Sequence, residues 1–106
     1  MIIVYKKWGS EVWLVNNDKY CAKFLSIDEG AQSSYHYHPE KMETFYCLEG
    51  EVMLNIKGQE FLLKEPYTIN PNTCHSFYGI TDAVIIEIST PHRDEDVVRL
   101  TESKGG

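Results

Sequence analysis

The sequence contains no apolar run close to the roughly 20 residues that a membrane-spanning helix requires. Its first residues, MIIVYKKWGS, lack the basic start and longer apolar core of a signal peptide. Only three cysteines are present, an odd number at wide spacing, which argues against a disulfide framework. We therefore expect a cytoplasmic protein without membrane association, in which Cys21, Cys47 and Cys74 are free thiols.

Positive charge is also scarce. Ten Lys and Arg residues stand against sixteen Asp and Glu, for a net charge of −6, and the basic residues form no stripe. This distribution excludes nucleic acid as an expected partner. A chain of 106 residues is long enough for one hydrophobic core and too short for a second lobe. We predict a single domain over residues 1–106, with a core barrel at about 10–90 and a C-terminal tail at 91–106.

Helical patterns are nearly absent from the chain. Short segments rich in β-branched and aromatic residues alternate with turns at Asn, Asp, Gly and Pro. Their tight spacing predicts an all-β sandwich or barrel of antiparallel strands. Residues 93–103, with acidic residues at their start, form the only weakly helical segment. The apolar segment MIIVY can supply an edge strand to a second copy, so we expect a homodimer.

The strongest chemical signal lies between Gly30 and Gly50. His36 and His38 are two residues apart, which places both imidazoles on one face of a strand. Glu43 follows five residues later, and a third histidine, His75, lies downstream. Imidazole and carboxylate groups are ligands for a divalent transition metal, and a third imidazole could complete such a set.

The spacing in this region resembles a known family. Residues 30–50 read G-x5-H-x-H-x4-E-x6-G, which resembles the first motif of the cupin superfamily, and Asn70–His75 resembles the second. The resemblance implies a double-stranded β-helix, the cupin jelly-roll barrel. It also implies a divalent transition metal (Zn, Mn, Fe or Ni) held by His36, His38, Glu43 and His75. The remaining histidine, His92, follows the last strand signal, and we expect it to be exposed.

A finer resemblance is to the cupin domain of type II mannose-6-phosphate isomerases. It rests on Trp8-Gly9, Lys23, Glu87, the acidic pair Glu95-Asp96 and Arg99. This resemblance implies an isomerase or epimerase of a sugar or sugar phosphate that uses a divalent metal as Lewis acid. A metal-dependent aldose–ketose isomerase is the favoured activity, and a carbohydrate is the expected small-molecule substrate.

Such a reaction needs a base close to the metal. Glu87 is the first candidate, because a carboxylate among the isoleucines of AVIIEIST is costly to bury and has its pKa raised by an apolar setting. The alternative is a salt-bridged or exposed glutamate. Lys23 could orient a substrate oxygen or pair with Glu87, and its alternative is a solvent-facing lysine. By strand parity Phe45, Cys47 and Phe77 should line the pocket, and Tyr35 and Tyr37 should face away from it.

Two other functions use the same metal ligands. One is a cupin dioxygenase with Fe(II), since ligand type alone does not select the metal. The other is a non-catalytic module that binds a small molecule. Enzyme activity is the favoured interpretation because Lys23 and Glu87 accompany the ligands.

Overall fold

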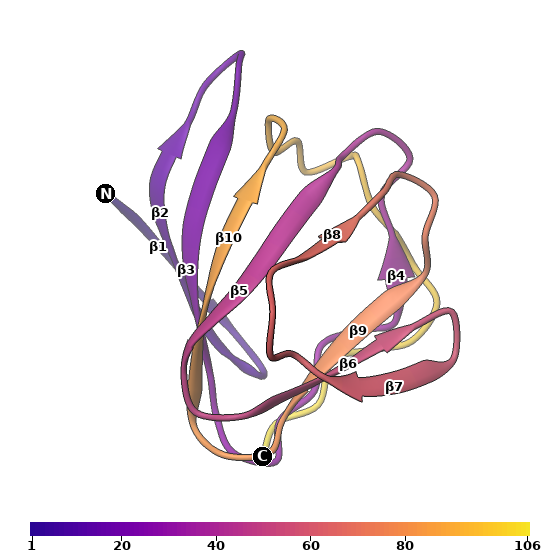
Figure 1. Ribbon diagram of the computed structural model, residues 1–106. Helices are drawn as coiled ribbons and strands as arrows, with labels where there is room; N and C mark the ends of the chain where they lie inside the picture. Colours follow the sequence, from indigo (N-terminus) through magenta and orange to yellow (C-terminus); the bar gives the residue numbers. More distant parts are fainter.

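Two antiparallel sheets face each other in the computed structural model, which describes all residues 1–106 (Figure 1). The six-stranded sheet has the order β1 (Ile2–Lys6), β2 (Gly9–Asn16), β3 (Cys21–Ile27), β10 (Ala83–Ser89), β5 (Glu43–Glu49) and β8 (Tyr67–Ile69). The five-stranded sheet has the order β11 (Val98–Arg99), β4 (His36–Tyr37), β9 (His75–Gly79), β6 (Val52–Ile56) and β7 (Gln59–Leu62). The all-β prediction is confirmed. The structure contains no helix with the length and apolar content needed to cross a bilayer.

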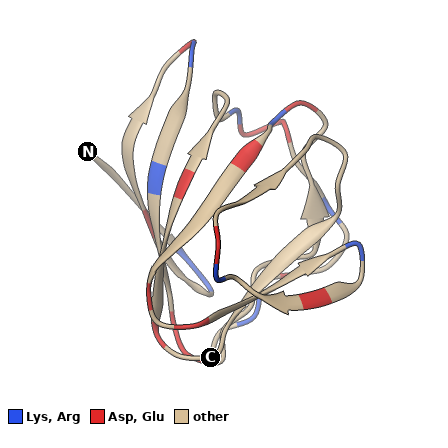
Figure 2. Ribbon diagram, in the orientation of Figure 1, with Lys and Arg blue, Asp and Glu red and all other residues tan.

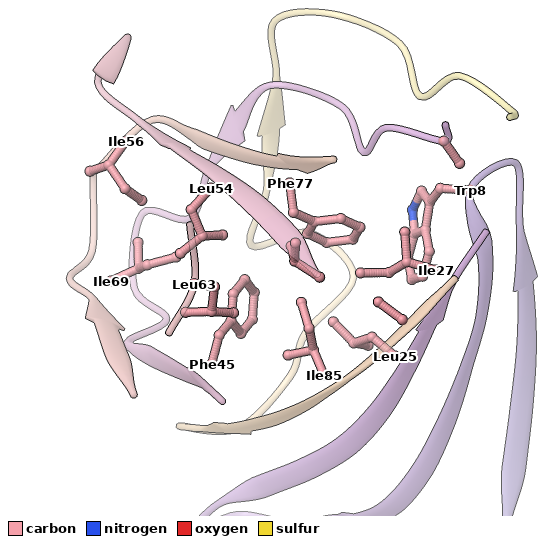
Figure 3. Close-up of a cluster of buried hydrophobic side chains, with 13 residues drawn as sticks. Trp8, Leu25, Ile27, Phe45, Leu54, Ile56, Leu63, Ile69, Phe77 and Ile85 are labelled. Atoms are coloured by element: carbon pink, nitrogen blue, oxygen red, sulfur yellow. The ribbon is translucent and has the colours of Figure 1, made fainter. Parts of the chain in front are cut away.

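The core fills the space between the two sheets (Figure 3). In β3 and β10 every second side chain is buried, as expected for strands with one face against a core. Trp8 meets Phe77 edge-to-face at 4.9 Å, and Phe77 lies 6.2 Å from Phe45. The core comprises Trp8, Leu25, Ile27, Ala31, Phe45, Val52, Leu54, Ile56, Leu63, Ile69, Phe77, Ala83 and Ile85. This apolar layer supports the polar side chains described below.

The segment after β10 is not helical, so the weak helical expectation for residues 93–103 is wrong. Its backbone pairs with the barrel instead: β11 pairs with β4, and Gln32 pairs with Lys104. Asp96 is buried, and its carboxylate accepts the backbone N–H of Glu40 at 2.8 Å. Such tertiary contacts outweigh a low helix propensity. Residues 91–106 therefore take part in the barrel.

The turn at Gly50 provides a stability test of this fold. Gly50 has φ +75°, and a Cβ added there would lie 2.1 Å from the Asp82 carbonyl oxygen. Gly58 has φ +87° with nothing within 4 Å of its added Cβ, so it is a matched control. Gly58→Ala should lower the free energy of unfolding by about 1 kcal/mol, the conformational cost alone. Gly50→Ala should lower it by about 3 kcal/mol, because a clash with backbone is added.

Urea unfolding of the two variants measures this difference. An equal decrease in the free energy of unfolding for both variants would contradict close packing of the Gly50 turn against Asp82.

Candidate metal centre

Three imidazoles converge where β4 pairs with β9. His36 lies opposite His75 in the β4–β9 pair, and His38 follows directly after β4. The rings of His36 and His75 are 4.5 Å apart between centroids, and His38 lies 5.0 Å from His36. One nitrogen of each ring lies within 4.8 Å of the others. This arrangement is a candidate three-histidine metal site.

Hydrogen bonds fix the tautomer of each ring. A backbone carbonyl can only accept, so each Nδ1 next to one must carry the hydrogen. These bonds have lengths of 2.7–2.8 Å and join His36 to Ser34, His38 to Asp96 and His75 to Thr73. The Nε2 atoms are left with free lone pairs. Metal-binding histidines show the same pattern, in which the second nitrogen is held by a backbone or carboxylate acceptor.

Glu43 adds an oxygen to the three nitrogens. Its Oε2 lies 3.0 Å from Nε2 of His75 and 3.3 Å from Nε2 of His38. Both Glu43 Oε2 and His75 Nε2 are buried without a hydrogen-bond partner. Buried polar atoms are normally satisfied, and a cation bound between these two would satisfy both. We call His36, His38, Glu43 and His75 the ligand group.

The charge states in the ligand group suit a metal. Burial, together with the neighbouring His75, lowers the pKa of His36 to about 3. Burial opposes the charge of Glu43, but the adjacent imidazoles of His38 and His75 and the charge of Lys41 outweigh it and hold the pKa of Glu43 well below its usual range. His36 is therefore neutral and Glu43 ionised at neutral pH, as metal coordination requires. Three imidazoles and one carboxylate fit a divalent transition metal.

A cavity of about 310 Å³ lies beside His36, His38 and Glu43, and a second polar group lines it as well. Figure 2 shows a basic position on β3 beside an acidic position on β10. The only charged residues of these strands are Lys23 and Glu87, which are cross-strand partners. Together with Lys41 and His92 they line the cavity that also contains His36, His38 and Glu43. We call Lys23, Lys41, Glu87 and His92 the lysine cluster.

Glu87 is buried at 4% exposure, and its Oε2 lies 3.3 Å from the ammonium group of Lys41. Burial, reinforced by the charge of Glu43, raises the pKa of Glu87. Burial opposes the charge of Lys41, but the Glu87 and Glu43 carboxylates outweigh it and raise the pKa of Lys41. Sequence reasoning missed Lys41. The available signal was its place in the four-residue spacer between His38 and Glu43.

Lys23 is buried at 2% exposure, so the solvent-facing alternative is wrong. Its ammonium group lies 3.6 Å from Glu11 Oε1, 3.0 Å from His92 Nδ1 and 4.5 Å from the centre of the Trp13 ring. Its ion-pair partner is therefore Glu11, whereas Glu87 pairs with Lys41.

His92 is not the exposed histidine expected from its position. Its side chain is 20% exposed, and its ring contacts Lys23, Lys41 and Trp13. Phe45 and Phe77 line the cavity as predicted, whereas Cys47 packs against the core instead. Tyr35 and Tyr37 are not among the cavity residues, in agreement with their predicted orientation.

The fold and the histidine arrangement together define a barrel of the double-stranded β-helix type with a candidate metal site. The chain belongs to the cupin domain family, whose model matches residues 23–89. Solved structures with the same fold include KdgF from Halomonas sp. (TM-score 0.75, 19% identity, 81% of each chain). Another is PAC13 from Streptomyces (TM-score 0.82, 12% identity, 95% of this chain and 84% of that one).

Curated relatives are sugar isomerases. The D-lyxose/D-mannose isomerase of Thermosediminibacter oceani is 31% identical over 85% of this chain and 66% of its own length. The D-lyxose ketol-isomerase of Cohnella laeviribosi is 33% identical over 79% of this chain and 63% of its own length. The chain thus spans slightly less than two thirds of the length of these relatives.

Proposed function

We propose that this protein is a metal-dependent aldose–ketose isomerase of small sugars. One observation carries the proposal: His36, His38 and Glu43 of the ligand group line a single cavity of about 310 Å³ together with the buried Glu87. This volume is at the lower end of small-molecule sites, as a pentose or hexose requires. The identity of 31–34% with curated sugar isomerases supports the same reaction class.

His36, His38, Glu43 and His75 would hold the metal, which we propose to be Zn, Mn, Fe or Ni. When bound, a divalent metal supplies Lewis acidity to the neighbouring hydroxyl and carbonyl oxygens of an open-chain sugar. The neutral His36 and the ionised Glu43 described above are ready for this role without prior loss of a proton.

Glu87 is proposed as the base. It accepts the proton from C2 of the aldose and returns it to C1, while the hydroxyl proton passes from O2 to O1, so the ketose has the same composition. Burial raises the pKa of Glu87, which makes its carboxylate a stronger base than an exposed glutamate. Lys41, 3.3 Å away, keeps the ionised form oriented.

The two lysines have a complementary role. Negative charge develops on the substrate oxygens as the proton leaves carbon, and fixed ammonium groups in a dry cavity stabilise it. Lys23 and Lys41 are buried and already paired, so little reorganisation is needed. Phe45 and Phe77 form an apolar part of the cavity wall, which helps to exclude water.

Turnover of D-lyxose and D-mannose, followed together with oxygen uptake, tests the proposal against its alternatives. An isomerase yields the corresponding ketose without oxygen consumption. Oxygen uptake on diols or thiols would instead indicate an Fe(II) dioxygenase. Sugar binding without conversion by metal-loaded protein would indicate a non-catalytic module.

The finer likeness to type II mannose-6-phosphate isomerases leads to a test at Arg99. This residue is the cross-strand partner of His36, lines the cavity and has no carboxylate within ion-pair distance. Arg99→Gln is expected to raise KM for mannose 6-phosphate about tenfold, because a charge-assisted hydrogen bond to phosphate is lost. The KM for free mannose should stay unchanged.

Arg93→Gln is the matched control, since Arg93 also lines the cavity but is paired with Glu40. It should leave both KM values within about twofold of the wild type. Equal effects of Arg99→Gln on the two sugars would contradict phosphate recognition by Arg99.

We also propose a homodimer. The edge strand β1 leaves Ile2, Ile3 and Tyr5 exposed. On the outer face of the sheet an apolar row crosses five strands in register, from Ile3 through Val12, Phe24 and Ile86 to Tyr46. An apolar outer face of this kind is typical of an interaction surface. The mass of the particle in solution, by light scattering, tests this proposal.

A further inference from the structure

His92 is held rigidly in the loop after β10. Its backbone N–H donates to Asn16 Oδ1 at 2.9 Å, and its carbonyl accepts from Asn16 Nδ2 at 3.2 Å. Its ring packs against Trp13 with the centroids 4.8 Å apart. Both Asn16 and Trp13 belong to β2. The ring is therefore positioned by the six-stranded sheet, although the loop that carries it has no regular structure.

Both ring nitrogens have assigned partners. Nε2 lies 2.9 Å from Oδ1 of Asp94. Nδ1 lies 3.0 Å from Nζ of Lys23 and 3.3 Å from Nζ of Lys41. A carboxylate accepts and an ammonium group only donates, so Nε2 must carry the hydrogen and Nδ1 the lone pair. His92 is therefore the neutral Nε2–H tautomer, the opposite of the Nδ1–H tautomer in the ligand group.

The Nδ1 lone pair of His92 accepts from two ammonium groups, which carry the same charge. Lys23 and Lys41 are both buried, and their ammonium groups repel each other in a low-dielectric wall. Each has its own carboxylate, Glu11 for Lys23 and Glu87 for Lys41. Nδ1 of His92 is the one acceptor within hydrogen-bond distance of both. The position of each ammonium group relative to the other thus depends on His92.

We infer that His92 is a positioning residue that holds the ammonium groups of Lys23 and Lys41 side by side on the cavity wall, where they form a binding site for a substrate oxyanion. Its catalytic meaning rests on the proposed isomerase function. The arrangement of the ring and the two lysines is a property of the protein without substrate, so it can be tested separately.

Protonation of His92 at Nδ1 would remove the acceptor that the ammonium groups of Lys23 and Lys41 share. The groups around it act in both directions: burial lowers the pKa of His92, the hydrogen bond to Asp94 raises it, and Lys23 and Lys41 lower it. Trp13 and Asn16 carry no charge, and Glu11 and Glu87 are engaged by the lysines. The net effect is a pKa below the ordinary histidine range. The lone pair is therefore present at neutral pH and is lost only as the pH falls through this lowered pKa.

Two variants separate positioning from a structural role. His92→Ala removes the acceptor but keeps the backbone contacts to Asn16, which any residue can make. His92→Asn keeps an acceptor, because its Oδ1 can occupy the place of Nδ1. We expect His92→Ala to lower kcat about 10- to 100-fold with KM changed less than about threefold. His92→Asn should restore kcat to within about threefold of the wild type.

A nuclear magnetic resonance measurement on metal-free protein gives an independent result. Long-range ¹H–¹⁵N correlations should show His92 as the Nε2–H tautomer at neutral pH. The Nζ hydrogens of Lys23 and Lys41 should be protected from exchange in the wild type and in His92→Asn, and lose protection in His92→Ala. An Nδ1–H or doubly protonated ring, or unchanged lysine signals in His92→Ala, would overturn the inference. Absence of turnover by the wild type would instead count against the proposed function, while these spectra would still decide the role of His92.

Discussion

Glu87→Gln is expected to lower kcat by about three orders of magnitude while the metal content of the protein stays unchanged. A positioned general base contributes about 10²–10⁴-fold to the rate of proton transfer, and glutamine cannot accept the proton. The substitution preserves size and can keep a hydrogen bond from Lys41, which lies 3.3 Å from the present carboxylate. The loss should therefore appear in kcat rather than in folding or metal binding. Steady-state kinetics on the metal-loaded variant measures it.

The dependence of wild-type activity on pH gives a second test of Glu87 as the base. Glu87 must be ionised to act as a base, and burial together with the charge of Glu43 raises its pKa above the ordinary glutamate range. Activity of the wild type should therefore rise with pH through this raised pKa. Glu11→Gln is the comparison variant: it keeps the base, so its activity should still rise with pH, through a lower pKa because the charge of Glu11 contributes to the raised pKa of Glu87. A Glu87→Gln variant with kcat within threefold of the wild type would show that another group is the base.

His75→Ala is expected to remove the metal. Its Nε2 is buried without a hydrogen-bond partner and lies 3.0 Å from Glu43 Oε2, so it is central to the ligand group. Loss of an outer-shell partner alone weakens metal binding about 10- to 100-fold, and loss of a ligand should exceed about 100-fold. Elemental analysis after gel filtration, with calorimetric titration of the metal, measures the change.

The matched control for this variant is His92→Ala. His92 lines the cavity together with His36 and His38, but its ring nitrogens are engaged by Asp94 and the two lysines. The His92→Ala variant should bind metal with the same stoichiometry as the wild type. Full metal occupancy in both His75→Ala and His36→Ala would refute the metal site.

The ligand group could be predicted from the sequence because its geometry follows from strand periodicity. The two-residue spacing of His36 and His38 places both on one side of β4 and its continuation. The match to the cupin motifs supplied Glu43 and His75, and the register of β4 with β9 places His75 opposite His36. Alternation likewise placed Glu87 on the same face of its strand as Ile85, and the structure shows that this row is buried.

The lysine cluster could be predicted only in part, because it depends on contacts between distant segments. Lys41 lies in a loop, where no periodicity indicates which way a side chain points. His92 is placed by its contact with Asn16, 76 residues earlier in the chain. Pairing with Glu87 was one of the roles expected for Lys23, and the two residues are cross-strand partners. Strand parity could not show that Glu11 and Lys41 would be the ion-pair partners, because these depend on side-chain direction.

The expected helix at residues 93–103 failed for a related reason. Its acidic residues were interpreted as a helix start, but Asp96 accepts the N–H of Glu40 and its carbonyl binds His38. The segment thus supports the ligand group, and this tertiary role cannot be inferred from local composition.

The most direct test of the account is incubation of the metal-loaded protein with D-lyxose and D-mannose in D₂O, followed by ¹H nuclear magnetic resonance. We expect that the corresponding ketose forms, that part of it carries deuterium at C1 because Glu87 exchanges its proton with solvent, and that removal of the metal by a chelator stops the reaction. Ketose formation at the same rate after the metal has been removed, or no ketose from either sugar while the metal is bound, would contradict the proposed metal-dependent isomerase.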